Sequence, residues 1–270
     1  MSQSLVIVIG DPDRGVRPAI ESGWLSQQSR IFIPSMMLGR GDLDWSSRVD
    51  EKTFIARTGR LPLEGEIGCA AAHVAAYRAL LETSHEWALV LESDVCITDQ
   101  HELSAVVQVV QGNLIPDGHV VSLLTDKWVT THGSIELEDF VVMRATTAPH
   151  GAVAYILDRT AARLMIEEQT PIGSVSDWPV TINDVDFLFV PLAAIHHPTD
   201  ELQLQSTVAP GIKRSTLVPL RVRIMMWLGV WYALNRSRFD GLDDYYHRIL
   251  QPRMHRHMLR FGRRQPRNIL

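Results

Sequence analysis

Short aliphatic runs alternate along the chain with longer stretches of helical periodicity, and this alternation constrains the fold more than any other feature. Seven runs bounded by turn residues are expected to be strands, namely residues 5–9, 30–34, 87–92, 120–124, 141–144, 152–157 and 185–190. Five intervening stretches are expected to be helices, namely residues 16–29, 65–83, 101–111, 159–168 and 175–182. Asp158 is a good N-cap for the fourth of these helices. Strands that alternate with helices predict a layered α/β domain with a mainly parallel central sheet.

The strand expected at 87–92 ends in two acids, Glu92 and Asp94, separated by Ser93. In α/β sheets ligands bind beyond the carboxyl ends of the strands, so both acids lie where chemistry is expected. Two carboxylates this close repel, and one tends to hold a proton unless a cation lies between them. Carboxylate oxygens suit Mg²⁺ or Mn²⁺, which also bind substrate phosphates. The spacing alone leaves open a second interpretation, in which both acids are simply solvated at a strand end.

Three blocks around this strand follow the order of a known family. The block GRLPLEGEIGCAAAHVAAYRALL, residues 59–81, precedes the strand, and HGAVAYILDRTAARLMI, residues 150–166, and SVSDWPV, residues 174–180, follow it. In this order the blocks resemble glycosyltransferase family 25, the lipooligosaccharide galactosyltransferase type. Members typically read Gly-Glu-Ile-Gly-Cys, two or three small residues and Ser-His, then a strand ending in Glu-Asp-Asp, a Gly-x-x-x-Tyr segment before a helix, and Asp-Trp. The resemblance covers about residues 1–200 and is most specific at 65–69 with His73.

The resemblance implies a nucleotide-sugar transferase of the GT-A type with a single Rossmann-like domain, expected here over residues 1–212. It also implies a divalent metal, usually Mn²⁺, and an inverting transfer, most often of galactose from UDP-galactose, onto a saccharide of lipopolysaccharide (LPS) or a similar surface glycan. Glu92 and Asp94 match the outer positions of the family's acidic triplet and are the expected metal ligands. Ser93 departs from the triplet at its middle position. Because a middle side chain can point away from the ligands, we expect metal binding to survive this departure.

In the SVSDWPV block, the resemblance gives the Asp-Trp pair as Asp177 and Trp178. An acceptor hydroxyl needs a general base within hydrogen-bond reach, and Asp177 is the candidate. Trp178 is a candidate to stack on a sugar face. Two alternatives stay open for Asp177, namely acceptor binding and the N-cap of a short helix. Asp184 and Asp186 are rival bases.

Glu66 and His73 are seven residues apart in the helix expected at 65–83 and therefore share a helix face. They either contact the donor or acceptor, or form a buried polar pair that fixes the helix on the sheet; a metal-ligand role for His73 is not favoured. GT-A enzymes often take a further metal ligand from a late loop, and an imidazole suits Mn²⁺. His196 or His197 fills this role, unless both are ordinary loop histidines.

Four other residues are considered for the donor pocket. Arg14 and Arg17 follow the first expected strand, where the nucleotide usually lies in the family, and either meet phosphate or uracil or are solvated charges at a helix start. His150 and Gly151 precede the strand at 152–157 and either line the donor pocket through close backbone approach or form a plain turn.

The two parts of the chain differ in charge. Residues 1–212 carry 13 Lys+Arg against 28 Asp+Glu, whereas residues 213–270 carry 13 against 3. The second part combines an apolar stretch at 224–234, flanked by arginines, with an arginine-rich terminus. This composition predicts a basic helical extension that binds an anionic membrane surface, where a lipid-linked acceptor would be within reach. A helical cap packed on the domain or on another copy is the alternative, and nucleic acid is disfavoured because no recognised module accompanies the charge.

The remaining features bear on compartment and function class. Cys69 and Cys96 both sit in apolar surroundings, which favours buried thiols in a reducing compartment over a disulfide. No apolar run reaches the ~20 residues of a membrane-spanning helix, and the N-terminus lacks the basic region of a signal peptide. We therefore expect a cytoplasmic protein that lies peripherally on the inner face of the membrane. The rival classes are a non-catalytic relative that binds a glycan or a partner, which Ser93 makes credible, and a nucleotidyltransferase, which IGDPDRG fits poorly.

Overall fold

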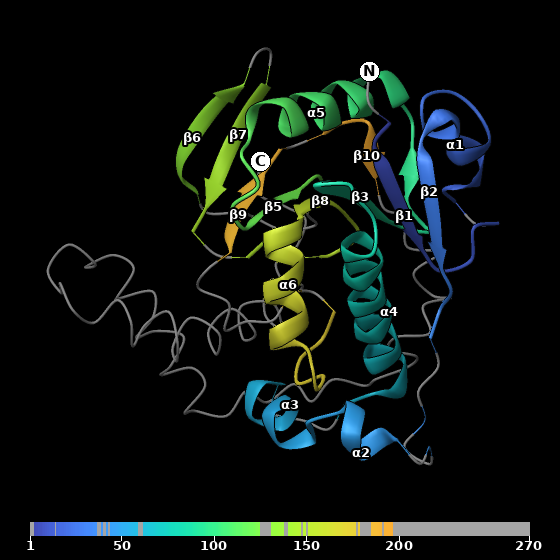
Figure 1. Cartoon of the computed structure of the whole chain (residues 1–270), viewed down its shortest axis with the longest axis vertical. Coiled ribbons are helices and arrows are strands. Elements are labelled where there is room, and N and C mark those ends of the chain that lie inside the picture. Colours follow the sequence, from blue (N-terminus) through green and yellow to red (C-terminus); the bar gives the residue numbers. More distant parts are fainter. Residues whose placement is uncertain are drawn as a thin grey trace, which may run out of the picture.

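The computed structural model of the chain describes residues 3–13, 15–36, 39, 42, 44–58, 62–124, 131–137, 140–146, 148–149, 151–176, 178, 185–190 and 192–196, with the side chains of 55–58 left undescribed. These residues form an α/β arrangement in which a central sheet lies between two helical layers (Figure 1). The predicted layered α/β class is confirmed.

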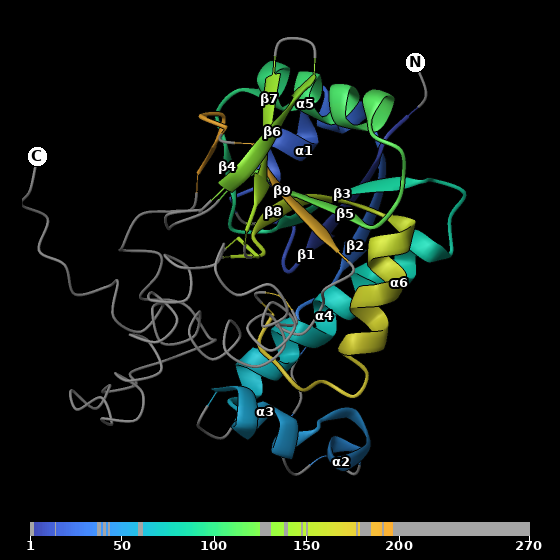
Figure 2. The ribbon, with the colours of Figure 1, turned by 90° about the vertical axis from the view of Figure 1, so that its left-hand side faces the viewer.

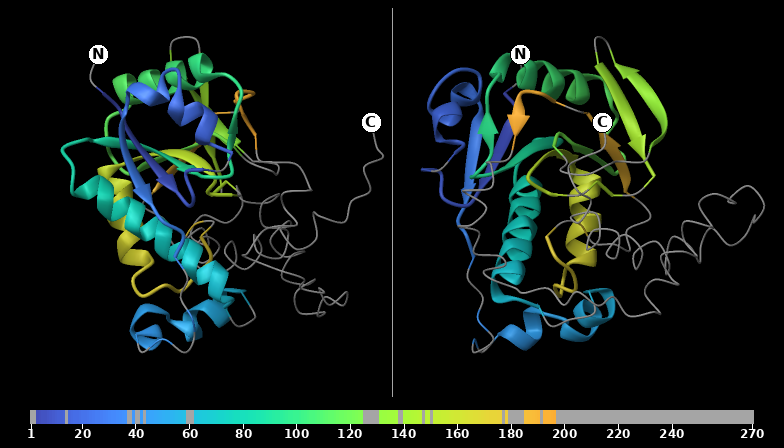
Figure 3. Two further views of the ribbon diagram at one scale, coloured as in Figure 1. Left: turned by 90° about the vertical axis from the view of Figure 1, so that its right-hand side faces the viewer. Right: turned by 180° about the vertical axis from the view of Figure 1, so that it is seen from behind.

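The helices are α1 (Arg17–Glu21), α2 (Trp45–Arg48), α3 (Glu51–Thr58), α4 (Glu64–Leu81), α5 (Gln100–Asn113) and α6 (Arg159–Glu168). On one face of the sheet lie α5 and the short α1, and on the other α4 and α6 lie side by side (Figures 1 and 3). Beyond the amino-terminal end of α4, away from the sheet, lie α2 and α3 (Figure 2).

Eight strands form the central sheet in the order β2-β1-β3-β8-β5-β9-β7-β6. Their bounds are β1 Leu5–Ile9, β2 Ser29–Ile33, β3 Trp87–Glu92, β5 His119–Ser122, β6 Thr131–Leu137, β7 Phe140–Ala145, β8 Ala154–Asp158 and β9 Asp186–Phe189. Because β8 runs antiparallel to both β3 and β5, the parallel groups β2-β1-β3 and β5-β9 point the same way. The antiparallel β7 reverses the direction and β6 restores it, so six of the eight strands are codirectional, as the sequence predicts. A separate two-stranded sheet pairs β4 (Cys96–Ile97) with β10 (Ile195–His196).

The strand β3 shows how the sheet divides the core. Leu89 and Leu91 belong to the cluster on the α5 side, whereas Ala88 and Val90 belong to the cluster on the side of α4 and α6, and all four are completely buried. A strand covered on both faces reads as a continuous apolar run, which is why β3 is recognisable in the sequence. By the alternation of side chains along a strand, Glu92 falls on the face that α4 covers.

The opposite edge of the sheet carries a charged cluster. Asp158, confirmed as the N-cap of α6, accepts hydrogen bonds from the backbone N–H groups of Ala161 and His119, each at 2.7 Å. Nδ1 of His119 lies 3.5 Å from Asp158, and its Nε2 lies 3.7 Å from Asp186, which also pairs with Arg144. Burial raises the pKa of Asp158, but hydrogen bonds from His119 and Ala161 outweigh burial and leave that pKa below its ordinary value. The contact with Asp158 raises the pKa of His119, although burial opposes the change.

The helix expected at 16–29 is wrong beyond Glu21. Gly23 adopts φ of +65°, a conformation that ends the helix, and the chain continues as a 3₁₀ turn at Leu25–Gln27 before entering β2 at Ser29. Here the local backbone preference of a glycine overrides an apolar periodicity that would otherwise suit one long helix.

Four further elements differ from expectation. The strand β6 is not predicted because most of its side chains are exposed and polar, as suits an edge strand. The helices α2 and α3 are not predicted either, since both are short and lie at the end of the molecule away from the sheet. Of the helix expected at 175–182, the described residues 175, 176 and 178 are not helical.

The basic extension expected at 213–270, and the domain end expected at 212, lie outside the described residues. In the part of the chain that the structure describes, no helix combines the length and apolar character needed to cross a bilayer. Cys69 and Cys96 are thiols rather than a disulfide, as predicted, and both are partly exposed instead of fully buried.

Candidate functional site

The chain turns where β3 ends, and this turn carries the two acids. The N–H of Glu92 donates to the carbonyl of Val153 at 2.8 Å, and the N–H of Val95 donates back to the carbonyl of Glu92 at 3.1 Å, which closes a four-residue turn. The N–H of Ser93 donates to the carbonyl of Ile9 at 2.8 Å, so the turn is fixed to the end of β1. The acids therefore stand at the carboxyl edge shared by β1 and β3, where ligands bind in such sheets.

Ser93 occupies the space beside a glycine at the end of β1. Gly10 has φ of +107°, and a Cβ placed on it would lie 2.4 Å from Oγ of Ser93. Ser93 is buried, whereas the flanking Glu92 and Asp94 are partly exposed. The middle position of the acidic motif is therefore a packing position in this chain, whereas the outer two positions stay partly accessible to solvent.

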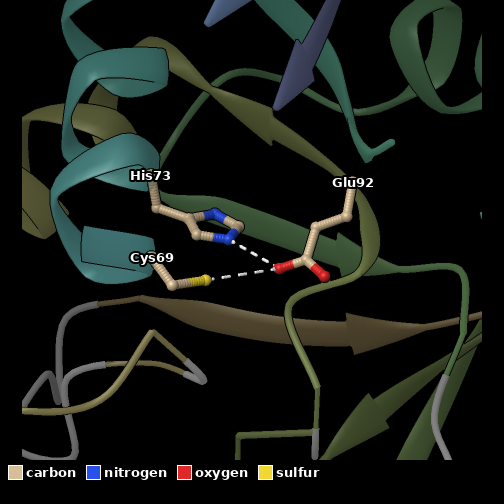
Figure 4. A group of neighbouring side chains, drawn as sticks. All are labelled: Cys69, His73 and Glu92. Atoms are coloured by element: carbon tan, nitrogen blue, oxygen red, sulfur yellow. Dashed lines mark hydrogen bonds and ion pairs between the residues drawn. The ribbon is translucent and has the colours of Figure 1, made fainter. Parts of the chain in front are cut away.

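Glu92 forms a cluster with two residues of α4 (Figure 4). Its Oε1 lies 3.1 Å from Nε2 of His73 and accepts a hydrogen bond from the thiol of Cys69 at 3.7 Å. Cys69 and His73 are one helical turn apart and project from the same face of α4. The sulfur, nitrogen and oxygen atoms lie within 4.8 Å of one another, so these three side chains could hold a metal ion.

Two buried tyrosines lie on the side of His73 that faces away from Glu92. Nδ1 of His73 lies 2.8 Å from the hydroxyl of Tyr155, which in turn lies 3.5 Å from the hydroxyl of Tyr77. His73 is 1% exposed, and neither tyrosine exceeds 2%. Burial raises the pKa of both phenols, so each keeps its hydrogen near neutral pH. Both ring nitrogens of His73 have partners, and the imidazole cannot turn without losing them.

Aromatic rings pack Tyr155 in turn. Trp178 meets Tyr155 edge-on at a centroid distance of 4.9 Å and meets Phe187 at 5.4 Å. The indole N–H donates to the carbonyl of Pro149 at 2.7 Å, and the residue is 3% exposed. Its φ of +139° is one that residues other than glycine rarely adopt. Trp178 is therefore part of the core behind the Glu92 cluster. Its contact with a sugar stays a prediction, and the packing described here leaves almost none of the ring exposed for such a contact.

The sequence profile of glycosyltransferase family 25, an LPS biosynthesis protein family, matches residues 46–180. This range is 135 of the 270 residues, half of the chain, and contains Cys69, His73, Glu92 and Tyr155. The chain belongs to glycosyltransferase family 25. Membership implies glycosyl transfer in LPS biosynthesis, from a nucleotide-sugar donor to a saccharide acceptor. A comparison with curated proteins finds no match.

The family 25 acids and the late histidine are placed as follows. Glu92 belongs to the cluster on α4, whereas Asp94 is not a member of that group and lies two residues further along the turn. His196 is exposed on β10, and the antiparallel pairing with β4 sets it opposite Cys96. The late segment thus pairs with the residues just beyond the two acids. Metal binding by Asp94 and His196 stays a prediction.

Several predicted site residues lie outside the described residues, namely Arg14, His150, Asp177, Asp184 and His197. Their roles stay predictions. The other rival base, Asp186, starts β9 and pairs with Arg144, which places it at the edge of the sheet opposite Glu92. Arg17 is exposed and pairs with Asp13 and Glu21, as a solvated charge at a helix start would. Gly151 is partly exposed with φ of +89°, which suits a turn.

Glu66 has a structural role of its own. It is buried, and its Oε2 accepts a hydrogen bond from the N–H of Leu63 at 3.1 Å, which caps the start of α4. Glu66 and His73 therefore do not act as one pair: the first fixes the helix, and the second points to the acid of β3.

The sequence-based interpretation missed Cys69 and Tyr155 as site residues. The signal for Cys69 is its spacing of four from His73, because two helix residues at this spacing can bind the same metal ion. Tyr155 matches the tyrosine of the family's Gly-x-x-x-Tyr segment. The motif identifies this position but does not reveal that the tyrosine contacts His73. That the imidazole lies between Tyr155 and Glu92 is visible only in the folded chain.

Proposed function

We propose that this family 25 protein is a metal-dependent, inverting hexosyltransferase of the GT-A type. It transfers galactose from UDP-galactose to a saccharide acceptor of LPS or a related surface glycan. The observation that carries the proposal is Glu92, a carboxylate fixed at the carboxyl edge of β3, partly exposed and contacted by His73. Family membership supplies the reaction class; the donor, the metal and the stereochemistry rest on the resemblance in the motifs.

The residues at the end of β3 fit a divalent cation. The side chain of Glu92 is 22% exposed, and the turn brings Asp94 two residues after it, so these two carboxylates would hold a hard ion such as Mn²⁺ or Mg²⁺. His196 or His197 would add an imidazole from the late segment. When bound, such an ion stabilises the negative charge that gathers on the departing diphosphate.

Other residues would supply orientation and proton transfer. His73 contacts Oε1 of Glu92 through Nε2 and the hydroxyl of Tyr155 through Nδ1, and these two contacts keep the carboxylate in one orientation. Asp177 would accept the proton of the acceptor hydroxyl as that hydroxyl attacks the sugar on the face opposite the diphosphate. Arg14, His150 and Gly151 would line the donor pocket.

A panel of UDP-sugars tests the proposal. Purified chain, Mn²⁺ and a lipooligosaccharide acceptor should turn over UDP-galactose, and a chelator should stop the reaction. Glu92→Gln and Asp94→Asn should each lower turnover by roughly 100-fold or more, because each removes a carboxylate that would hold the ion. Arg163→Met, an exposed change on α6, is the matched control and should keep wild-type turnover. Calorimetry that detects binding of neither Mn²⁺ nor UDP would instead identify a non-catalytic relative.

The basic extension would hold the enzyme at the inner face of the membrane, on the cytoplasmic side. Residues 213–270 carry 13 Lys+Arg against 3 Asp+Glu, and each cation near an anionic surface contributes about 1 kcal/mol. The chain should therefore sediment with phosphatidylglycerol vesicles and be released by salt. Equal retention on neutral vesicles would contradict this part of the proposal.

A further inference from the structure

Cys69, His73 and Glu92 form a ligand set that differs from the paired acids. Two members come from one face of α4 at positions i and i+4, and the third comes from the end of β3. This spacing brings two helix side chains to one ion, and a ligand from a second element completes a three-residue site. We propose that these three side chains bind a divalent ion of the Zn²⁺ class and leave its fourth position open. The inference goes beyond the proposed transferase activity and does not depend on it.

The ligand atoms already stand close to the separations that such an ion imposes. Tetrahedral coordination with bonds of about 2.0–2.3 Å puts neighbouring ligand atoms roughly 3.3–3.8 Å apart. Oε1 of Glu92 lies 3.1 Å from Nε2 of His73 and 3.7 Å from Sγ of Cys69. Cys69 and Glu92 are partly exposed, so small rotations of these two side chains would admit the ion from the outer side of the cluster.

Tyr155 prepares His73 for this role. Metal-binding histidines usually donate their other ring N–H to a neighbouring oxygen, which fixes the ring and its tautomer. The hydroxyl of Tyr155, 2.8 Å from Nδ1, can accept that hydrogen while it donates to Tyr77 at 3.5 Å. Nε2 then directs a lone pair at Glu92, and a lone pair 3.1 Å from a carboxylate repels it unless a cation or a proton lies between them.

The sulfur determines which ions the cluster selects. Thiolate and imidazole suit Zn²⁺ and Co²⁺, whereas Mn²⁺ and Mg²⁺ prefer oxygen ligands. As the metal–sulfur bond forms, the thiol of Cys69 gives up its proton to the buffer. Only Oε1 of Glu92 is shared with Cys69 and His73. The second carboxylate oxygen is left for the ion expected between Glu92 and Asp94.

Cobalt binding to the full chain tests the proposal, because a cobalt–thiolate bond gives a near-ultraviolet charge-transfer absorption that oxygen and nitrogen ligands do not. The 11 histidines can bind Co²⁺ elsewhere, but only the 2 cysteines can give this band. We expect the band to saturate at one Co²⁺ per chain. Zn²⁺ should abolish it, since Zn²⁺ binds more tightly and is d¹⁰.

Cys69→Ser should remove the band, and Cys96→Ser, the matched control, should keep it. Tyr155→Phe retains all three ligands, so the band should remain while the affinity for Co²⁺ falls about 10–100-fold. In case Cys69→Ser fails to fold, alkylation of the wild-type chain gives a second readout: Zn²⁺ should protect Cys69 from iodoacetamide and leave Cys96 reactive.

A folded wild-type chain without the band, or equal alkylation of both cysteines with and without Zn²⁺, would overturn the proposal and leave a hydrogen-bonded cluster. Asp94→Asn separates this site from the transferase metal. It should leave the cobalt band unchanged and lower Mn²⁺-dependent turnover, so the failure of one proposal is distinguishable from the failure of the other.

Discussion

Glu92 ends a strand whose other five residues are buried and apolar, and α4 makes its charge tolerable there. A carboxylate that is partly removed from water needs hydrogen-bond partners, and His73 and Cys69 lie within reach of the same oxygen. The orientation of Glu92 thus depends on His73, and that of His73 depends on Tyr155. A series of contacts connects the core to the carboxyl edge of the sheet.

Tyr155→Phe should lower the free energy of unfolding by about 1–3 kcal/mol, because Nδ1 of the buried His73 loses its partner. Tyr77→Phe is the matched control. Within the described part of the chain, its hydroxyl meets the hydroxyl of Tyr155 at a long 3.5 Å, so its loss should cost less than about 1 kcal/mol. Urea denaturation of both variants measures the difference. Equal losses would contradict the role given to Tyr155.

Gly10→Ala should destabilise the chain by at least about 2 kcal/mol, because the residue has φ of +107° and the new Cβ would lie 2.4 Å from Oγ of Ser93. Gly112→Ala is the control. A Cβ there meets nothing within 4 Å, and alanine in α5 should be neutral or stabilise by up to about 1 kcal/mol. Thermal unfolding checks both, and a harmless Gly10→Ala would show that the turn does not need this close approach.

At the scale of elements, Arg159 joins the two helices that lie under the site. It is the first residue of α6, and its guanidinium donates to the carbonyls of Leu80 at 3.1 Å, Leu81 at 3.1 Å and Thr83 at 2.7 Å, where α4 ends. The last carbonyls of an α-helix lack the usual N–H partner four residues further on, so the arginine acts as a C-terminal cap supplied by another helix.

Arg159→Met keeps most of the side-chain volume and removes these donors. We expect a loss of about 2–3 kcal/mol in the free energy of unfolding, since hydrogen bonds to charged groups contribute about 1.5–3 kcal/mol each and water replaces part of this. Arg163→Met, exposed on the same helix, should stay within about 0.5 kcal/mol of wild type. If the two variants proved equally stable in urea, the capping role would be wrong.

The sequence predicts those elements whose pattern is repeated and buried. The strand β3 and the helix α6 are found at the expected bounds, and α4 within two residues of them, because continuous apolar runs and a good N-cap are local signals. The edge strand β6 is missed because its residues are mostly exposed, so no core-facing pattern marks it. The break at Gly23 is missed because its positive φ competes with an apolar periodicity.

The candidate site likewise divides into features that a local sequence signal reveals and features that depend on contacts between distant residues. Glu92 could be predicted from its place at the end of a strand, and His73 from its motif. Their contact could not, because it joins residues of two elements, and the contact of His73 with Tyr155 spans 82 positions in the chain. The packing of Ser93 against Gly10 likewise depends on how β1 and β3 pair.

At the scale of the whole molecule, the two edges of the sheet differ in what their charges do. The carboxyl edge holds Glu92 in a partly exposed position, as a binding site requires. The opposite edge holds Asp158 and His119 together with Asp186 and Arg144, and there the charges satisfy one another. Charges of the second kind contribute to stability and make it depend on pH.

His119→Gln should reveal this dependence. The pKa of His119 is raised by Asp158, so its contribution is fully present below its unfolded pKa of about 6.5 and is lost as the pH rises through the folded value. The pKa of Asp158 is lowered, so its contribution is present above about 3.9 and is lost as the pH falls through the folded value. The stability difference between wild type and variant should therefore be largest between about pH 4 and 6.5 and shrink above. A difference that stays constant from acid to alkaline pH in urea titrations would contradict it.

The central claim is that the carboxylates at the end of β3 hold the cation that binds the donor's diphosphate. Anomalous diffraction from crystals of the chain soaked with Mn²⁺ and UDP tests it most directly. The account predicts a manganese peak within bonding distance of Glu92 and Asp94 and of the diphosphate oxygens. A bound UDP with no manganese at these residues, or with both side chains turned away from the ion, would contradict it.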